Sequence, residues 1–411
     1  MKRLILSALS MAVASMAGAQ NVEKHSFDNF NVHVFTSPEA MGDISILVEG
    51  ERELVMVEPQ SFYKSIEEFN GYIAKLGKPL KYIVASYHAG GLASYNPKSI
   101  YMVEPMVAFM QSEMAQGMLK KFDGAFGGAM DTRMVKPRRT IPATSIQKWA
   151  GVEFSFTAGA ASDFPASSIN IGGKVFYTHF APNMMHPSPM QLNSPKAVDA
   201  TLAELIKAKH SGCEIFVGSH GSVASREDVE FMVGYLTKVK ELISSSATSD
   251  IFAQRLIVAY PSLAGIESVS ALSRRLYPNE VVSDDEAAVR SRVNDYFNMV
   301  SNLDETIAKG LWAESENISI ITPRSHFIGF DAIMNDFLKR TFSKMKYRKL
   351  SSFSEAVSIY GDMASVQLYW KFDTIDADDK EHQTRGRESL IFSKTDGEWR
   401  LVHVHYSRMP Q

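Results

Sequence analysis

The sequence contains very little that would cross-link the chain or hold it in a membrane. Its 411 residues include one cysteine, Cys213, so no disulfide can form within the chain and the fold depends on its hydrophobic cores. After the first twenty residues, no stretch is long and apolar enough to span a bilayer. The 43 Lys and Arg residues nearly balance the 46 Asp and Glu residues, without a basic block. This balance predicts neither nucleic acid nor an anionic membrane as a partner.

Two common catalytic motifs are also missing. No Gly-x-x-x-x-Gly-Lys-Ser/Thr sequence is present, and the glycine-rich residues 124–129 do not replace it, so a phosphate-binding loop is not predicted. No Gly-x-Ser-x-Gly sequence occurs, so the strained turn that presents a nucleophilic serine is not predicted either.

The first nineteen residues have the three parts of a secretory signal peptide. Basic Lys2 and Arg3 precede an apolar run over residues 4–13 and small residues up to Ala19. The alternative is an ordinary buried helix at the N-terminus. We expect cleavage after Ala19, which predicts a periplasmic or secreted mature protein that begins at Gln20.

The length of the chain exceeds what one ordinary hydrophobic core supports, and it predicts two domains. We expect the first domain over residues 20–276, a linker at 277–282 and the second domain over 283–411. In the first domain, strands and helices alternate. The expected elements are a hairpin of residues 44–48 and 53–57, a helix at 65–76, a strand at 81–85, a helix at 194–212, a strand at 214–218, and helices from 225 and over 263–275.

Three segments of the first domain carry a resemblance to a known family. They are residues 54–59, 83–91 and 217–221, and each runs from a buried strand into a loop that holds polar residues. In this order they resemble the metallo-β-lactamase fold over roughly residues 21–275. The resemblance implies an α/β domain with αββα layers, in which two sheets pack face to face with helices outside.

The same resemblance implies a metal site, but this sequence lacks most of its ligands. The family binds zinc or iron through a His-x-His-x-Asp-His loop, a further His, a bridging Asp and a closing His. This chain offers His88 in the loop, His179 where the bridging Asp is expected, and His220 at the closing position. Zinc needs three or four converging donors. A dinuclear site is therefore not expected; His88, His179 and His220, with Asp163, are candidate ligands for a single zinc ion, or else polar remnants of a cleft.

The last part of the chain predicts an α+β domain. Ser283 and Glu286 form a capping box at a helix start, and Asp396-Gly397 is typical of a type I′ turn between strands. A curved antiparallel sheet around a long helix is expected. The expected elements are helices from 283 and over 304–312, a strand at 318–322, a helix at 331–345, and strands within 346–360, 364–374, 385–392 and 399–406.

Several motifs in this domain carry a second resemblance. They are Thr322-Pro323, residues 327–329, residues 386–388 and residues 396–405. Together they resemble the SnoaL-like branch of the nuclear transport factor 2 (NTF2) superfamily, and most of all the domains related to the association domain of calmodulin-dependent kinase II. The resemblance implies a cone-shaped α+β barrel. That scaffold hosts isomerases, cyclases, hydrolases and assemblies that catalyse nothing, so it does not decide the activity.

Polar side chains inside such a cone would form its site. Strand alternation puts His403 and His405 on the face of Trp399 and Leu401, which is typical of a cavity wall. The candidate catalytic residues are His403, His405, Arg387 and Glu388, and the candidate ligand-binding residues are Tyr296, Trp312, Arg387 and His326. Arg387 is expected to hold an acidic or polar molecule while a histidine transfers protons. The alternative is a structural Arg–Glu pair with hydrogen-bonded histidines.

These observations leave three functions open. The first is an exported protein that binds or transforms a small molecule in the cone cavity, without a cofactor. The second is a non-catalytic assembly protein that forms a homodimer through its C-terminal domain. The third is a mononuclear metal-dependent hydrolase.

Overall fold

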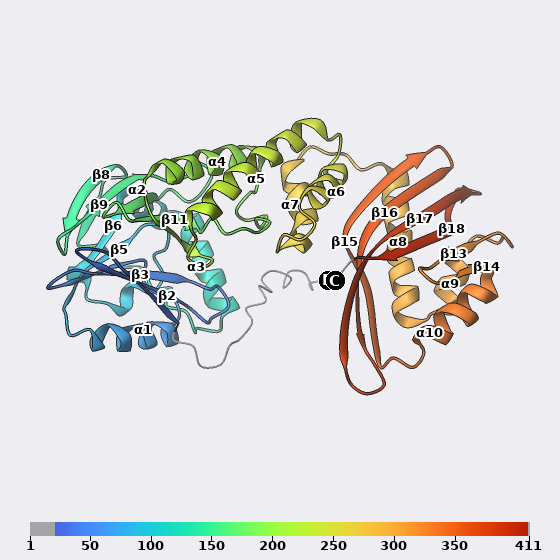
Figure 1. The fold of residues 1–411 in the computed structure, drawn as a ribbon, viewed down its shortest axis with the longest axis horizontal. Helices are drawn as coiled ribbons and strands as arrows, with labels where there is room; N and C mark the ends of the chain where they lie inside the picture. Colours follow the sequence, from blue (N-terminus) through green and yellow to red (C-terminus); the bar gives the residue numbers. More distant parts are fainter. Residues whose placement is uncertain (1–20, 410–411) are drawn as a thin grey trace. The chain divides into compact units, whose positions relative to one another are not determined.

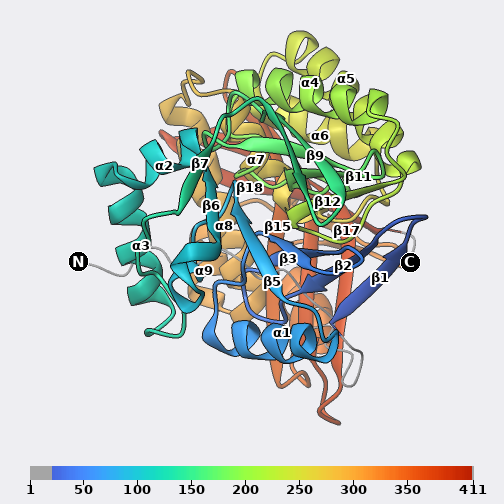
Figure 2. The ribbon, with the colours of Figure 1, turned by 90° about the vertical axis from the view of Figure 1, so that its left-hand side faces the viewer.

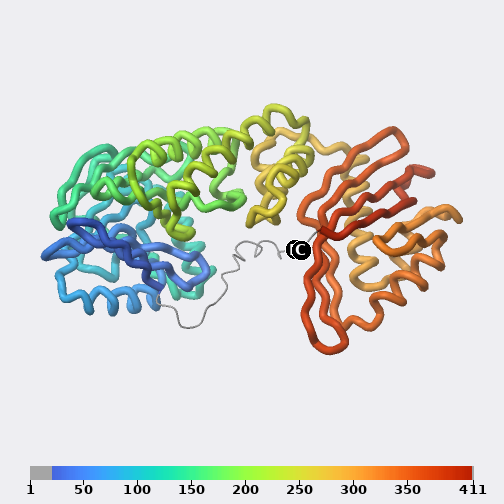
Figure 3. The backbone as a smooth tube through the Cα atoms, in the orientation of Figure 1, coloured from blue at the N-terminus to red at the C-terminus, as the bar shows by residue number. Residues whose placement is uncertain are grey.

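The computed structural model describes residues 21–409 (Figure 1), so the expected signal peptide at residues 1–19 lies outside the described part. The chain divides into two compact units. The first contains the described residues up to Met184 together with Lys196–Lys238, and the second contains Met185–Pro195 and the described residues from Val239 onward. The backbone can be followed through each unit in Figure 3.

The first unit is built on two β-sheets. The seven-stranded sheet has the order β1-β2-β3-β4-β5-β6-β7, and the five-stranded sheet has the order β12-β11-β10-β9-β8. Strands β1 to β4 pair antiparallel, and β4 to β7 pair parallel. The strands are β1 (Val22–Ser26), β2 (Asn31–Thr36), β3 (Ile44–Glu49), β4 (Leu54–Val57), β5 (Leu80–Ala85), β6 (Ile100–Val103), β7 (Arg139–Ile141), β8 (Ser145–Trp149), β9 (Val152–Ala158), β10 (Ser167–Ile171), β11 (Val175–Phe180) and β12 (Ile215–His220).

One hydrophobic core joins the two sheets, and helices cover their outer sides. The core includes Val57 of β4 and Val217 of β12. Helix α1 (Tyr63–Lys75) packs on the first sheet through Phe69, which stacks on Phe35 with ring centroids 4.7 Å apart. Helices α4 (Pro195–His210) and α5 (Arg226–Ser245) cover the second sheet. Two views show α1 on one side of the sheets and α4 and α5 on the other (Figures 1 and 2).

Most predicted elements of this unit are present, and the mixed α/β class is confirmed. The hairpin of β3 and β4 forms as expected, and Ser225 and Asp228 cap α5 by reciprocal hydrogen bonds. The helix predicted over 65–76 begins earlier, at Tyr63, and ends at Lys75. Oγ of the buried Ser65 lies 2.9 Å from Oγ of Ser37. Helices α2 (Glu104–Met110) and α3 (Glu113–Ala125) were not predicted.

The second unit has a six-stranded sheet of order β14-β13-β18-β17-β16-β15. Its core lies between this sheet, helix α8 and the π-helical segment η4. Oγ of Ser283 accepts the N–H of Glu286 at the start of α8, as predicted. The elements are α6 (Ser249–Ala259), α7 (Val269–Leu276), α8 (Asp284–Asn302), α9 (Glu305–Leu311), β13 (Ser319–Ile321), β14 (His326–Ile328), η4 (Ala332–Lys339), α10 (Arg340–Phe342), β15 (Tyr347–Tyr360), β16 (Met363–Ile375), β17 (Glu381–Thr395) and β18 (Glu398–Arg408).

The division between the units falls earlier in the chain than the predicted linker at 277–282. Helices α6 and α7 belong to the second unit because they pack on β15. The hydroxyl of Ser270 donates to the carbonyl of Phe353 across 2.7 Å, and the amide of Gln254 donates to the carbonyl of Gln367 across 2.8 Å. The sequence did not predict α6 at all, and its apolar residues gave no sign of which sheet they cover.

Among residues 21–409, no helix combines the length and the apolar character that crossing a membrane requires.

Candidate functional site

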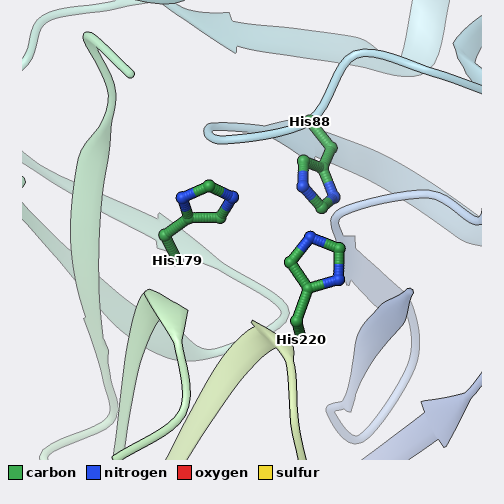
Figure 4. A group of neighbouring side chains, drawn as sticks. All are labelled: His88, His179 and His220. Atoms are coloured by element: carbon green, nitrogen blue, oxygen red, sulfur yellow. The ribbon is translucent and has the colours of Figure 1, made fainter. Parts of the chain in front are cut away.

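Three histidines of the first unit converge at one end of its strands. His88 follows β5, His179 lies in β11, and His220 ends β12. One ring nitrogen from each lies within 4.8 Å of the others, and the three rings face a common space (Figure 4). The structure therefore brings together the three histidines that the sequence singled out as candidate metal ligands.

Hydrogen bonds orient two of these rings. Nδ1 of His220 lies 3.0 Å from the carbonyl oxygen of Met41, which can only accept a hydrogen bond, so Nδ1 carries the proton. Nδ1 of His179 lies 2.7 Å from a carboxylate oxygen of Asp163 and donates to it in the same way. In both rings Nε2 is left with its lone pair. A second hydrogen bond that fixes the tautomer is the usual companion of a histidine that ligates a metal.

Burial keeps two histidines of the cluster, His88 and His220, neutral. Desolvation, with a smaller contribution from the neighbouring His179, lowers the pKa of His220 to about 4. The pKa of His88 lies well below its ordinary value, first because of burial and then because of His220 and His179. Neutral imidazole is the form that binds a metal ion. His88 and His220 therefore need no change of protonation to act as ligands.

The loop that carries His88 is held by a buried carboxyl group. Glu58 accepts hydrogen bonds from the backbone N–H groups of Ser86, Tyr87 and His88, at 2.9, 2.8 and 3.0 Å. Its own backbone has φ of 57°, a conformation that few residues other than glycine adopt. Desolvation raises its pKa to about 7, against the effect of these hydrogen bonds. Glu58 thus fixes the position from which His88 reaches the cluster.

Two aspartates stand beside the histidines. Asp163 was predicted as a ligand, but its carboxylate is bonded to Nδ1 of His179 and it is not in the ligand group. Asp43 was not singled out by the sequence. It is 1% exposed, and one of its carboxyl oxygens lies 3.8 Å from Nδ1 of His220. Desolvation raises its pKa to about 6, against hydrogen bonds from Ser61.

The second unit contains a cavity of about 120 Å³ inside the curved sheet. A cavity of similar size, about 150 Å³, is known to hold benzene, so this one accommodates a ligand of about one ring. Most of its wall is apolar. The residues that line it are Tyr296, Val300, Phe337, Leu338, Thr341, Phe342, Leu350, Trp370, Phe372, Thr384, Glu388, Tyr406 and Arg408.

The polar centre of this cavity is a carboxyl–phenol pair. Tyr296 of α8 donates its hydroxyl hydrogen to Oε1 of Glu388 on β17 across 2.6 Å, and both side chains are buried. Desolvation raises the pKa of Glu388 to about 8, although the hydrogen bond from Tyr296 opposes the shift. Glu388 is therefore mostly protonated at neutral pH and acts as a hydrogen-bond donor. Both residues were predicted to face the cone.

The predicted cavity positions of His403 and His405 are wrong. The pairing of β17 with β18 is regular from the turn up to Leu401, which pairs with Phe392. A bulge then adds one residue, Val402, to β18, so that His403 pairs with Ile391. A bulge of one residue exchanges the two faces of a strand. Beyond it Val404 and Tyr406 face the core, while His405 is exposed and Nδ1 of His403 bonds with the hydroxyl of Ser319.

The remaining predicted residues also lie outside the cavity. Arg387 is exposed on the outer face of β17, where its guanidinium lies 5.8 Å from the ring centroid of Tyr369. His326 is exposed on β14. Trp312 is buried in the core, with backbone pairing to Leu401, but it does not line the cavity. The sequence did not identify the aromatic walls of the cavity or Arg408. The alternation of Leu368, Trp370 and Phe372 along β16 is the signal that could have indicated an apolar face.

Comparison with known proteins identifies relatives for the second unit. Residues 289–411 match the family model of the SnoaL-like domain. Among solved structures, the chain is similar to an NTF2-like superfamily protein from Salmonella enterica, with 31% identity and a TM-score of 0.29, over 30% of this chain and 89% of that chain. It is also similar to a candidate calcium/calmodulin-dependent protein kinase II association domain from Xanthomonas campestris (17% identity, TM-score 0.28, 31% and 90% coverage) and a candidate ketosteroid isomerase from Shewanella frigidimarina (20%, 0.27, 29% and 94%). No curated protein matches the chain.

Proposed function

Residues 289–411 form a SnoaL-like domain of the NTF2-like superfamily, and we propose that this domain binds a small, mostly apolar molecule and exchanges a proton with it through Glu388. The observation that supports the proposal most directly is the pair of Glu388 and Tyr296 in an otherwise apolar cavity. A buried carboxyl group in an apolar site stays protonated at neutral pH and becomes a general acid.

The geometry of the pair assigns a part to each oxygen of Glu388. Oε1 accepts the hydrogen of Tyr296, so the proton of the neutral carboxyl group belongs on Oε2. From Oε2 it passes to an oxygen of the ligand as that oxygen gains negative charge or leaves. The carboxylate that results keeps the hydrogen bond from Tyr296, which stabilises its charge. It then takes a proton from the ligand and returns to its neutral form, as an isomerisation or a dehydration requires.

A screen of small ring compounds on the full chain tests this function. We expect some of these compounds to raise the melting temperature of the wild-type protein. The Glu388→Gln and Tyr296→Phe variants should lose most of this increase, or should lose the conversion of the bound compound. Glu381→Gln serves as the control, because Glu381 is exposed at the start of the same strand. If both cavity variants behave like the wild type with every ligand found, the proposal is wrong.

The histidine cluster supports a second candidate function, a site for one metal ion in the first unit. His88, His179 and His220 would be its protein ligands, since they offer three imidazoles, a number that catalytic zinc sites commonly have. A cation bound here would also be favoured by Asp43, whose buried carboxyl group lies 3.8 Å from Nδ1 of His220. A bound zinc ion would act as a Lewis acid and lower the pKa of a bound water. The chain itself orients the rings of His179 and His220 through hydrogen bonds to Asp163 and Met41.

Metal analysis of the purified full chain tests this site. We expect about one zinc or iron ion per chain, and its loss in the His179→Ala and His220→Ala variants. His210→Ala is the matched control, because His210 is exposed at the end of α4. If the wild type equilibrated with excess zinc retains no more metal than the two variants, the metal site is wrong.

The proposal for the whole chain includes its location and assembly. We propose that the chain is exported through residues 1–19, that the first unit is a metallo-β-lactamase-like domain with a reduced ligand set, and that the protein forms a homodimer through its second unit. Sequencing of the mature N-terminus in the native host checks the first point, and Gln20 is the expected first residue. The mass of the native protein in solution checks the last, and a monomer at micromolar concentration would contradict it.

A further inference from the structure

The cavity of the SnoaL-like domain has polar groups at two separate levels. Glu388 of β17 is paired across the sheet with Tyr406 of β18, and the next inward-facing pair along these strands is Gly386 with Arg408. Inward-facing neighbours on one strand are about 7 Å apart. Glu388 is buried, whereas Arg408 is exposed. The carboxyl group therefore lies at the closed end of the cavity, and the guanidinium lies at its mouth.

Between these levels the wall is flat and aromatic. The indole of Trp370 lies on the backbone at Gly386, where a Cβ would be only 2.1 Å from the ring. Trp370 meets Tyr406 edge to face with ring centroids 6.0 Å apart, and Phe337 stacks on Tyr406 at 6.2 Å. Phe342 adds a further ring that packs against Phe337 at 5.7 Å. Aromatic walls that present faces and edges favour a planar ring between them.

The charge at the mouth is positive. Among the residues that line the cavity, Arg408 is the one cation and Glu388 the one carboxylic acid, and Arg324, which is outside the lining, also acts electrostatically on Tyr406. Neither arginine side chain makes an ion pair or hydrogen bond with another group in residues 21–409, whereas Arg290, elsewhere in the unit, pairs with Asp250 and Glu286. Because Glu388 is mostly neutral, no charge inside the cavity balances Arg408. An anionic group on the ligand would do so.

We propose that the ligand of this cavity is a small planar-ring carboxylic acid with a second oxygen on the opposite side of the ring. Its carboxylate pairs with Arg408 at the mouth, its ring lies between Trp370 and the other aromatic walls, and its opposite oxygen bonds with Glu388. The inference rests on the proposed small-molecule function and names the class of substrate.

Calorimetric titration of the full chain with three matched probes tests the inference. The probes are 4-hydroxybenzoate, which has both polar groups, benzoate, which lacks the hydroxyl, and 4-methylphenol, which lacks the carboxylate. We expect 4-hydroxybenzoate to bind about tenfold or more tightly than either of the other two, because each missing group removes one charged or buried hydrogen bond.

Variants of the two arginines on β17 and β18 assign the effect to the mouth of the cavity. Arg408→Gln is expected to lower the affinity for 4-hydroxybenzoate about tenfold and to change the affinity for 4-methylphenol by no more than about twofold. Arg387→Gln is the matched control, because Arg387 is exposed on the opposite face of the same sheet and is expected to change neither. Because Arg408 is itself exposed, its replacement does not threaten the fold.

The outcomes separate this inference from the function on which it rests. If 4-methylphenol binds as tightly as 4-hydroxybenzoate, or if Arg408→Gln leaves the acid unaffected, the substrate class is wrong although a cavity ligand exists. If none of the three probes binds, but another compound binds the wild type and fails to bind the Glu388→Gln variant, the substrate class is wrong and the small-molecule function stands. If no compound at all depends on Glu388, both are wrong.

Discussion

Gly386 of β17 lies directly beneath the indole of Trp370 on β16, and a Cβ at this glycine would come within 2.1 Å of both the indole Cζ2 and the backbone oxygen of Ser407. Gly386 and Trp370 are paired across the sheet. The indole is also held from its edge, because its Nε1–H donates to the carbonyl of Arg387 across 3.2 Å. The absent side chain therefore makes room for the flattest wall of the cavity.

Replacing this glycine by alanine should damage both the fold and the cavity. We expect Gly386→Ala to lower the free energy of unfolding by about 2 kcal/mol or more. The added methyl group would clash with the backbone of Ser407 and with the indole of Trp370, and neither can move away easily. Urea denaturation measures the change. Gly310→Ala in α9 is the control, since nothing lies within 4 Å of its added Cβ, and it should stabilise the protein by up to about 1 kcal/mol. Equal effects at both glycines would contradict the packing of Trp370.

The raised pKa of Glu388 makes stability depend on pH in a specific direction. Its pKa is about 8 in the folded protein, against 4.5 for an ordinary glutamate, so the folded state keeps a proton that the unfolded state releases. Stability from this group is full below about pH 4.5 and is lost as pH rises through about 8. We expect the wild type to lose on the order of a few kcal/mol between these values relative to Glu388→Gln.

The measurement is the difference between the two proteins, since other groups titrate in both. Melting temperatures of the wild type and of Glu388→Gln at pH 5 and pH 8.5 give the comparison, and the wild type should fall more. The buried Tyr296 remains a partner for the amide of the variant, so the fold is expected to persist. Parallel pH profiles would show that Glu388 does not hold a proton in the folded state.

Local sequence signals predicted the last hairpin but not which face of β18 is buried. Asp396 and Gly397 have φ of 52° and 82°, as the predicted type I′ turn requires. The bulge at Val402 then exchanged the faces, so Tyr406 entered the cavity in place of His405. A bulge depends on how two strands pair, so the alternation of polar and apolar residues along a single strand does not predict it. Arg387 and Glu388 are neighbours on β17 and so lie on opposite faces of the sheet, but which of the two points inward could not be read from the strand alone.

The histidine cluster shows the opposite case. His88, His179 and His220 are far apart in the sequence, and they were named as candidate ligands of one site because their positions correspond to ligand positions of the metallo-β-lactamase family. The structure places them together. Asp43 could not be found in this way, because it precedes β3 and only the packing of that segment against His220 shows its position.

The carboxyl group of Glu58 should be essential to the stability of the first unit. Glu58→Ala leaves three buried backbone N–H groups without acceptors, at Ser86, Tyr87 and His88. We expect a loss of roughly 3 kcal/mol or more in the free energy of unfolding. Glu51→Ala, at the exposed turn between β3 and β4, should change stability by less than about 0.5 kcal/mol. If Glu58→Ala is as mild as Glu51→Ala in chemical denaturation, the loop does not depend on this group.

Asp163 should affect the strength of metal binding without affecting its stoichiometry. Its carboxylate holds Nδ1–H of His179 at 2.7 Å, which aims the other ring nitrogen and makes it a better donor. Asp163→Asn keeps an oxygen that can accept this hydrogen but removes the charge, so zinc should bind about 10- to 100-fold more weakly with one ion still bound per chain at saturation. Competition against a chelator of known affinity measures the ratio. Asp123→Asn, on the exposed face of α3, should leave it unchanged. A complete loss of the ion in Asp163→Asn would instead make Asp163 a ligand, and an unchanged affinity would remove it from the site altogether.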